Sequence, residues 1–355
     1  MKGLILAAGL GTRLRPITSL KPKPTIAVAN RPLIHYAVQN LVDAGISDIG
    51  IVVSHDTIEH LKASLEGYPG ATFTWIIQAP PRGLAHAVKV SRDFLGDDDF
   101  MMYLGDNLFE HGIRSFREAF RPDEGVNAVL ALVPVEDPRQ LGVAVVEDGR
   151  ITELVEKPEV PPSNLAVAGV YVFDRTIHPI IENLEPGAKD EYQITDAIFG
   201  LIEQGGFVKP VQVEGWWKDT GKPEDILDAN RLMLMKTGRA IDGSAEQSEL
   251  TGDVVVAEGA TVRNSTIFGP AIIGAGSVIE NAYIGPFTTV GRDCTVSNSE
   301  VEYSVIGDHT SIRDIRERVR ESLIGEHVTL AGSGERPGSH RLVIGDRSEL
   351  LLTQD

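Results

Sequence analysis

The stretch Leu4-Ile5-Leu6-Ala7-Ala8-Gly9-Leu10-Gly11-Thr12-Arg13-Leu14-Arg15-Pro16 decides how the first half of the chain folds. An apolar run that ends in a glycine-rich turn is typical of the first strand of an α/β domain, whose loop offers backbone N–H groups to phosphate. Gly9 and Gly11 carry no side chain that would block this approach, and Arg13 adds a forked cationic donor. The loop is of neither the Walker nor the Rossmann type, because no Gly-Lys-Ser/Thr follows and Leu14 replaces the third glycine. A tight turn with surface arginines is the simpler alternative.

Segments typical of strands and helices alternate from residue 1 to about residue 238. Residues 49–53 and 100–104 are apolar like buried strands, and residues 32–44 have apolar positions at helical spacing. This alternation predicts an α/β layer with a mainly parallel, mixed sheet. A polar linker is expected at residues 239–251.

The hydrophobic pattern of the sequence changes over residues 252–355. Aliphatic residues recur every five or six positions, and Gly often follows them, as in Ile273-Gly274 and Ile284-Gly285. This hexapeptide repeat predicts a left-handed parallel β-helix, in which stacked coils share one core. The charged run 313–321 should be a loop or short helix and residues 333–341 another loop, after which Ile344 and Leu350 continue the repeat.

Bulk composition excludes several classes of protein. The net charge of −18 argues against a general nucleic-acid binder, which would be basic. The single cysteine, Cys294, cannot form an intrachain disulfide, and no Cys/His cluster has zinc spacing, so a reducing, cytoplasmic location is expected. Residues 1–8 are interpreted as a strand and not a signal peptide. No apolar run is long enough to cross a membrane.

One lysine and two aspartates follow in places suited to a phosphate site. Lys23 lies in Lys21-Pro22-Lys23-Pro24, where prolines fix an extended backbone, although a solvated loop is the alternative. Asp106 comes just past the strand at 100–104, where α/β proteins bind ligands, but it could also cap a helix. Asp219 precedes Thr220-Gly221 and could be an ordinary turn residue.

Together these motifs resemble the sugar nucleotidylyltransferases. The residues that carry the resemblance are Gly-x-Gly-Thr-Arg-Leu-x-Pro at 9–16, Lys23, and Trp-x-Asp-Thr-Gly at 217–221. The similarity covers residues 1–238 and extends into a β-helix tail found on some members; it is greatest to the long form of the thymidylyltransferase branch. It implies a Rossmann-like nucleotidyltransferase domain that, with Mg²⁺, joins dTTP to glucose-1-phosphate and releases pyrophosphate by in-line displacement.

The resemblance also implies roles for residues at the matching positions. Asp106 and Asp219 would hold Mg²⁺, which takes carboxylate and phosphate oxygens. Arg13 would stabilise the departing pyrophosphate, and Lys23 the α-phosphate. The residues expected to bind the nucleotide are Leu6, Ala8, Gly9, Gly11, Thr12, Arg13, Gln78, Pro81 and Gly83.

The base would be read by residues 78–87, Gln-Ala-Pro-Pro-Arg-Gly-Leu-Ala-His-Ala. This stretch is similar to the Gln…Gly-Leu-Ala-x-Ala of thymidylyl- and uridylyltransferases. There the glutamine amide offers the pyrimidine edge a donor and an acceptor, and the glycine lets the base approach the backbone. Gly83 taken alone would also suit an ordinary turn.

The sugar phosphate is expected to meet a second set of residues. In the family a glutamate at the place of Glu156 accepts hydrogen bonds from sugar hydroxyls, and a lysine at the place of Lys157 contacts the phosphate. An exposed turn is the alternative reading of these two residues. The full predicted set is Asn107, Gly142, Glu156, Lys157, Val170 and Trp217.

Several positions depart from the family pattern and bear on the choice of substrate. Ala27 replaces the proline that usually ends the lysine signature, and Pro24, Leu141 and Gln193 differ from the short thymidylyltransferases. A uridylyltransferase that uses UTP with glucose-1-phosphate, or a guanylyltransferase that uses mannose-1-phosphate, is therefore an alternative. The partners expected are dTTP or UTP and a hexose-1-phosphate.

Two functions of other classes are alternatives: a sugar acetyltransferase and a non-catalytic protein. A β-helix sugar acetyltransferase would use His309, His327 or His340 as a base, although solvated loop histidines are the simpler interpretation. A non-catalytic regulatory or assembly protein is disfavoured, because the cationic and acidic residues of the family site are present together. Since β-helix faces often associate, we expect a homo-oligomer, either a trimer or a tetramer.

Overall fold

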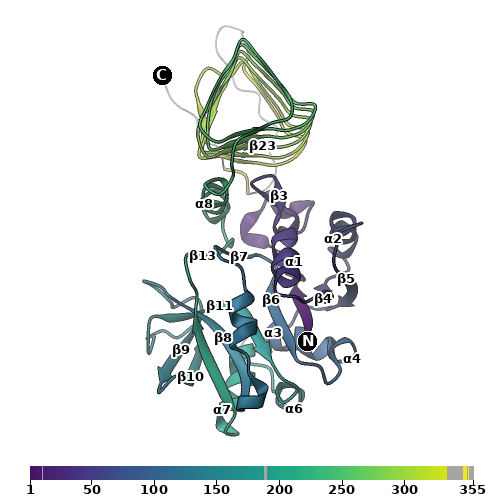
Figure 1. Cartoon of the computed structure of the whole chain (residues 1–355), viewed down its shortest axis with the longest axis vertical. Helices are drawn as coiled ribbons and strands as arrows, with labels where there is room; N and C mark the ends of the chain where they lie inside the picture. Colours follow the sequence, from purple (N-terminus) through teal and green to yellow (C-terminus); the bar gives the residue numbers. More distant parts are fainter. Residues whose placement is uncertain (10, 188–189, 334–346, 350, 352–355) are drawn as a thin grey trace. The chain divides into compact units, whose positions relative to one another are not determined.

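The computed structural model describes all residues except 10, 188–189, 334–346, 350 and 352–355 (Figure 1). The chain forms two compact units. The first consists of residues 1–10, 22–25 and 33–219, and the second of residues 11–21, 26–32 and 220–355. The second unit therefore contains segments from both ends of the sequence, and the boundaries at 238 and 252 stay a prediction.

A nine-stranded mixed sheet forms the centre of the first unit. Four neighbouring strands run parallel, in the order β5 (Thr72–Ile77), β4 (Asp48–Val53), β1 (Lys2–Leu6) and β6 (Phe100–Leu104). On the other side of β6 the sheet continues antiparallel through β11 (Leu165–Phe173), to which β8 (Val126–Pro134) and β9 (Gly142–Glu147) pair. The outer strands are β10 (Arg150–Glu156) and β12 (Phe207–Gln212). The predicted Rossmann-like α/β class is confirmed.

Helices cover both faces of this sheet, which explains why its central strands are almost wholly apolar. Successive side chains of β1 point to opposite faces, so Leu4 belongs to one buried cluster and Ile5 to the other. The cluster around Ile5 includes residues of α1 (Leu33–Asp43), α2 (Ile58–Leu65) and α5 (Arg114–Ala119). The cluster around Leu4 includes residues of α3 (Leu84–Val90), α4 (Arg92–Leu95), α6 (Ile177–Glu182) and α7 (Ile194–Glu203).

The second unit contains a parallel β-helix whose coils outline a triangle in Figure 1. The coils give short strands to three parallel sheets, of six, six and five described strands, as expected of the left-handed hexapeptide-repeat class. The first sheet is β14 (Ala240–Ile241), β17 (Val254–Val256), β20 (Ala271–Ile273), β23 (Thr288–Val290), β26 (Val305–Ile306) and β29 (Leu323–Ile324). The second is β15 (Ser244–Glu246), β18 (Thr261–Arg263), β21 (Val278–Glu280), β24 (Thr295–Ser297), β27 (Ser311–Arg313) and β30 (Thr329–Ala331). The third is β16 (Glu249–Thr251), β19 (Thr266–Phe268), β22 (Tyr283–Ile284), β25 (Glu300–Glu302) and β28 (Val319–Arg320).

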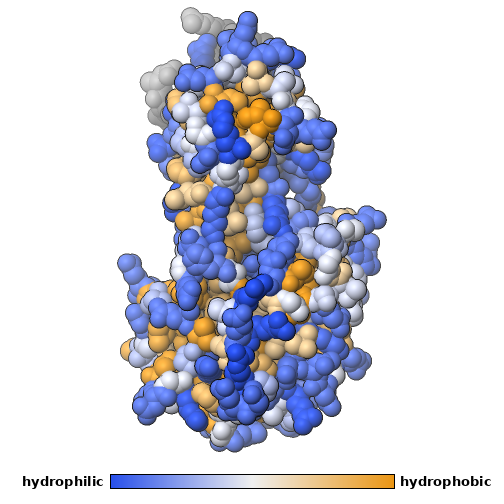
Figure 2. All heavy atoms as spheres, in the orientation of Figure 1, coloured by the Kyte–Doolittle hydropathy of each residue, from blue (hydrophilic) through white to orange (hydrophobic). Residues whose placement is uncertain are grey.

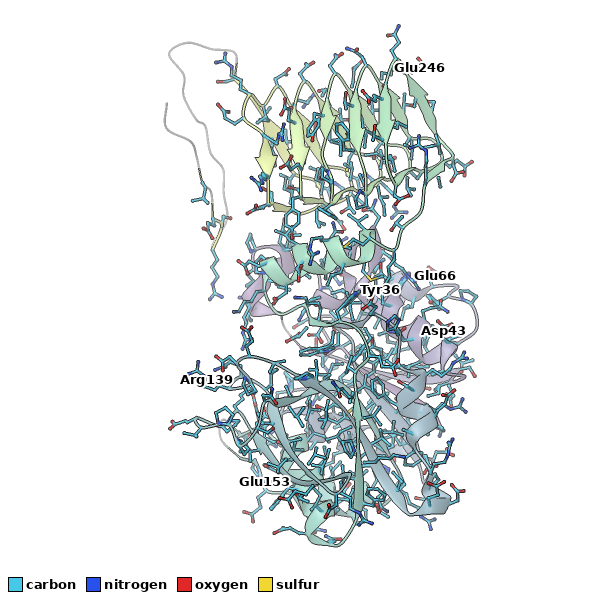
Figure 3. The ribbon with its side chains drawn as sticks, turned by 60° about the vertical axis from the view of Figure 1, so that its left-hand side comes forward. Tyr36, Asp43, Glu66, Arg139, Glu153 and Glu246 are labelled. Atoms are coloured by element: carbon cyan, nitrogen blue, oxygen red, sulfur yellow. The ribbon has the colours of Figure 1, made fainter. Side chains whose placement is uncertain are left out.

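The aliphatic residues of the repeat stack inside the coils. Val262, Ile279, Val296 and Ile312 are paired in register along the second sheet and are fully buried. Polar residues lie outside, as Glu246 of the first coil shows in Figure 3. That coil occupies residues 240–251, where a linker was expected, because its strands at the end of the β-helix are mostly exposed and therefore polar.

Two details of the repeat differ from expectation or cannot be compared. The charged run 313–321 is not a simple interruption, since β28 within it pairs with β25 and continues the third sheet. The loop expected at 333–341, the rung at Ile344 and the rung at Leu350 lie largely or wholly outside the described residues, as does His340.

Among the helices that the structure describes, none combines the length and apolar character needed to cross a membrane. Hydrophilic residues cover much of the face drawn in Figure 2.

Asn230 ties three parts of the second unit together. This residue of α8 (Pro223–Leu234) is 1% exposed. Its Oδ1 accepts hydrogen bonds from the Ala29 N–H (2.8 Å) and the Thr289 hydroxyl (3.3 Å), and its Nδ2 donates to the Phe287 carbonyl (3.2 Å). Ala29 lies between the short strands β2 (Ala27–Val28) and β3 (Arg31–Pro32), so one amide joins this hairpin, α8 and the β-helix.

We expect Asn230→Asp to lower the free energy of unfolding of the second unit by about 3–5 kcal/mol, because a buried carboxylate would face the Phe287 carbonyl unpaired. Asn264→Asp is the matched control, since it makes the same chemical change at an exposed site of the β-helix. Chemical denaturation followed by circular dichroism measures both. Equal effects of the two substitutions would contradict the role given to Asn230.

Candidate active site

The candidate site lies at the carboxyl ends of β1 and β6, the edge where parallel sheets bind ligands. The carbonyl of Leu6, the last residue of β1, accepts a hydrogen bond from the Gly105 N–H (3.0 Å). A Cβ on Gly105 would approach that carbonyl to 3.1 Å, so glycine permits the close contact. The turn that carries Asp106 is thereby held beside the start of the glycine-rich segment.

Lys23 brings the two predicted carboxylates together. Its Nζ lies 2.5 Å from Asp106 Oδ2 and 3.6 Å from Asp219 Oδ1. Lys23 is only 9% exposed, whereas both aspartates are partly open to solvent. A buried ammonium is stable only with such partners, because desolvation of an unpaired charge is costly. The three predicted residues therefore form one cluster with an accessible acidic side.

Pairing of two short strands explains how Asp219 reaches Asp106. β7 (Asn107–Phe109) directly follows the Asp106 turn and pairs antiparallel with β13 (Trp217–Asp219). In this register Asp219 lies opposite Asn107. Residues far apart in the sequence thus become neighbours through backbone pairing alone.

A chain of hydrogen bonds orients the Asp106 carboxylate. The indole N–H of Trp217 donates to Asn107 Oδ1 (2.7 Å), and Asn107 Nδ2 donates to Asp106 Oδ1 (2.8 Å). Gly169 makes room for this amide: its φ is +65°, and a Cβ there would lie 2.5 Å from Asn107 Oδ1. Asn107 and Trp217, which were predicted to bind the sugar phosphate, are thus also supports of Asp106.

The residues present fit a hard divalent cation. Two converging carboxylates, already bridged by one positive group, suit Mg²⁺, which commonly takes one or two protein carboxylates and completes its shell with phosphate and water. Within the described ranges, no group of three or more His, Cys, Asp or Glu side chains could hold a metal ion by itself. The donor set therefore suits a metal that arrives with a phosphate ligand.

Glu156 is the centre of a second cluster in the first unit. It ends β10 opposite Gly142, and its Oε1 lies 2.7 Å from Lys157 Nζ. The Thr195 hydroxyl donates to Glu156 Oε2 (3.4 Å). Burial, and then the charge of Glu156, raises the pKa of Asp196. This arrangement offers a carboxylate acceptor beside an exposed cation, and binding of a sugar phosphate here stays a prediction.

Val170, another of the predicted sugar-site residues, lies in the core. It lies in β11 in register with Tyr103, and its side chain is fully buried. The side chain therefore packs in the core of the first unit and is not available to a ligand.

Gln78 and Gly83 meet in a third cluster. Gln78 follows β5, and its Nε2 donates to the Gly83 carbonyl (3.0 Å) and lies 3.0 Å from His86 Nδ1. Gly83 has φ +95°, and a Cβ there would lie 2.4 Å from the Tyr192 carbonyl. Pro81 is exposed in the same loop. The glycine is thus required by a close backbone approach within the protein.

The glycine-rich segment is divided between the two units. Ala8 is buried and Gly9 is exposed in the first unit, and a Cβ on Gly9 would meet nothing within 4 Å. Gly11, Thr12 and Arg13 belong to the second unit. There Gly11 adopts a left-handed conformation, and its carbonyl accepts a hydrogen bond from the Thr18 hydroxyl (2.8 Å).

Arg13 is exposed in the middle of the short 3₁₀ helix Thr12–Leu14. Nearby in the sequence, Lys21 forms an ion pair with Glu326 of the β-helix. The segment that carries Arg13 is thus anchored to the tail within the second unit.

Three further residues of these clusters were not singled out from the sequence. His86 stands at the variable position of Gly-Leu-Ala-x-Ala, so the motif does not point to it. Its contact with Gln78 could be expected only if the helix were known to begin after Gly83. Thr195 and Tyr192 carry no local signal, because their contacts depend on how α7 and the loop before it pack.

Comparisons with known proteins point to one family. Residues 2–236 match the family model described as Nucleotidyl transferase. The chain is 46% identical over 360 residues to a "Glucose-1-phosphate thymidylyltransferase" of Streptomyces griseus, covering 99% of this chain and 100% of that protein. A protein of the same name from Streptomyces antibioticus is 44% identical, with 99% of each chain covered.

A solved structure is also similar to the described fold. It is titled as a putative glucose-1-phosphate thymidylyltransferase from Bacillus anthracis in complex with a sucrose, and it is 35% identical. The match has a TM-score of 0.61 and covers 65% of this chain and 94% of that one. By its site, its fold and these matches, the chain belongs to the nucleotidyl transferase family.

Proposed function

We propose that this enzyme is a glucose-1-phosphate thymidylyltransferase, which joins dTTP to glucose-1-phosphate and releases pyrophosphate. The observation that carries the proposal is the convergence of Asp106 and Asp219 on the Lys23 ammonium. The names of the two Streptomyces relatives, which match over nearly the full chain, support the choice of substrates.

The reaction is a direct displacement in which a phosphate oxygen of the sugar-1-phosphate attacks the α-phosphorus, and pyrophosphate leaves. Both reactants are anions, so the protein must neutralise charge and align the two phosphates. Lys23 provides a fixed cation for the α-phosphate. Asp106 and Asp219 would hold Mg²⁺, which when bound supplies Lewis-acid neutralisation of phosphate oxygens. Arg13 would stabilise the departing pyrophosphate.

The remaining roles follow the clusters. Glu156 accepts hydrogen bonds from sugar hydroxyls while Thr195 and Lys157 fix its orientation, and Lys157 is also the cation for the sugar phosphate. Gln78 contacts the base. Backbone groups from Leu6 to Thr12 bind the triphosphate, with Gly9 open to its approach. A homo-oligomer, either trimeric or tetrameric, and a cytoplasmic location stay predictions.

Asp106→Asn should lower turnover by about 10²-fold or more, because a neutral amide holds a divalent cation and its phosphate ligand far more weakly. Pyrophosphate release measures this effect, and the melting temperature shows whether the fold is intact. Asp123→Asn, at an exposed site in the same unit, is the control. Near-normal turnover in the Asp106 variant would refute the metal assignment.

Trp217→Phe should raise the Mg²⁺ concentration needed for half-maximal activity by about 10-fold, because Asn107 loses the donor that orients it toward Asp106. Trp75→Phe removes an indole elsewhere in the unit and serves as the control. A changed KM for the sugar phosphate with an unchanged Mg²⁺ requirement would instead assign Trp217 to the sugar.

The substrates are tested by measuring pyrophosphate release for all pairs of dTTP, UTP, GTP and ATP with glucose-, mannose-, galactose- and N-acetylglucosamine-1-phosphate. We expect the highest kcat/KM for dTTP with glucose-1-phosphate. A preference for UTP with glucose-1-phosphate, or for GTP with mannose-1-phosphate, would replace the proposal by one of the two alternative transferases.

A further inference from the structure

The Gln78 side chain has both of its amide hydrogens committed within the first unit. It is 4% exposed and follows directly after β5, where its backbone N–H donates to the Val53 carbonyl (2.8 Å). One Nε2 hydrogen is directed at the Gly83 carbonyl and the other at His86 Nδ1, each at 3.0 Å. No described residue donates a hydrogen bond to Gln78 Oε1, which is not sealed from solvent.

Chemistry fixes which amide atom occupies which position. A backbone carbonyl accepts only, so the atom of Gln78 that faces the Gly83 carbonyl must be the NH₂ group. The same NH₂ group lies against His86 Nδ1, which must therefore accept. Histidine accepts at Nδ1 only as the neutral tautomer that carries its proton on Nε2.

The partners of this amide are themselves held in place. The Tyr192 N–H donates to the Arg82 carbonyl (2.8 Å), and the Ala85 N–H donates to the Tyr192 carbonyl (3.1 Å). These two hydrogen bonds, one on each side of Gly83, hold its backbone against Tyr192. The His86 ring stacks on the Tyr192 ring, with centroids 6.0 Å apart and 22° between the planes. Neither the carbonyl nor the imidazole is free to follow a rotation of the amide.

We propose that neutral His86 is a positioning residue for base selection, which locks the Gln78 amide so that only its Oε1 acceptor is presented to the nucleotide. An acceptor at this position matches the N3–H of thymine or uracil and opposes the lone pair of cytosine N3. The inference rests on the proposed function and deepens it. It differs from the family expectation of a donor and an acceptor from the same amide, because here the donor side is already used.

The surroundings of His86 favour the neutral ring. Burial, and then the charges of Arg82 and Lys89, lower the pKa of His86 from its ordinary value of 6.5. The groups that face this region from other elements are the Tyr192 ring, over which both cations lie, Asp190, which pairs with Arg82, and Glu182, which pairs with Lys89. The two carboxylates do not cancel the cations, because the charges of Arg82 and Lys89 still lower the pKa of His86.

Protonation of His86 would weaken the selection. Nδ1 would become a donor and repel the Gln78 NH₂ group, while the Gly83 carbonyl would still accept from it. The amide would then be held by one contact and opposed by the other, so its orientation would no longer be locked. Since the pKa of His86 is lowered, the neutral ring predominates at pH 6.5 and above. Discrimination against cytosine should therefore be greatest at neutral and alkaline pH and decline as the pH falls and the ring gains a proton.

The experiment measures kcat/KM for dTTP and for dCTP with glucose-1-phosphate between about pH 5 and pH 8.5, and reports their ratio. The wild-type ratio should be highest at neutral and alkaline pH and fall about tenfold or more on acidification, as the loss of one hydrogen bond and the gain of an opposed pair predict. His86→Leu should have a low ratio at every pH. His86→Asn, whose Oδ1 can take the place of Nδ1, should restore a high ratio without the decline at low pH.

His60→Leu removes an exposed histidine of α2 and should leave the wild-type profile unchanged. A dTTP/dCTP ratio that is independent of pH in the wild type, or equal in the Leu and Asn variants, would overturn the proposal. The pH dependence of the wild-type dTTP/dCTP ratio tests the proposal even if the Leu variant does not fold. Absence of pyrophosphate release with every nucleotide would instead refute the proposed function.

Discussion

The candidate site depends on one interaction, the contact of the Lys23 ammonium with the carboxylates of Asp106 and Asp219. A largely buried cation needs these anions, and two anions this close need a cation between them. Each charge therefore constrains where the other two can lie. A substrate phosphate and a divalent ion can replace parts of this network without creating an unpaired charge.

Backbone geometry places these charges at the edge of the sheet. The pairing of β7 with β13 sets Asp219 beside the turn of Asp106, and the left-handed backbone at Gly169 leaves space for the Asn107 amide that orients it. The cluster at Gln78 uses the same device, because Gly83 lets two backbone segments approach too closely for any side chain. Glycine in this unit thus acts by allowing contact between segments distant in sequence.

The second unit relates the β-helix to the N-terminal signature. Asn230 of α8 joins the β-helix to a hairpin from the N-terminal part of the chain, and Glu326 of the β-helix pairs with Lys21. The tail therefore does more than add a repeat to the end of the sequence. It contacts the segment 11–21 through the ion pair of Glu326 with Lys21.

The sequence by itself determined the α/β class, the β-helix and the identity of the charged residues, because periodicity and short motifs are local properties. Lys23, Asp106 and Asp219 were found as motif members, yet nothing local states that they meet. Only the tertiary structure decided that Val170 is buried in the core, that β28 continues the coil through a charged run, and that His86 accepts from Gln78. These features depend on pairing and packing between distant segments, which no local pattern encodes.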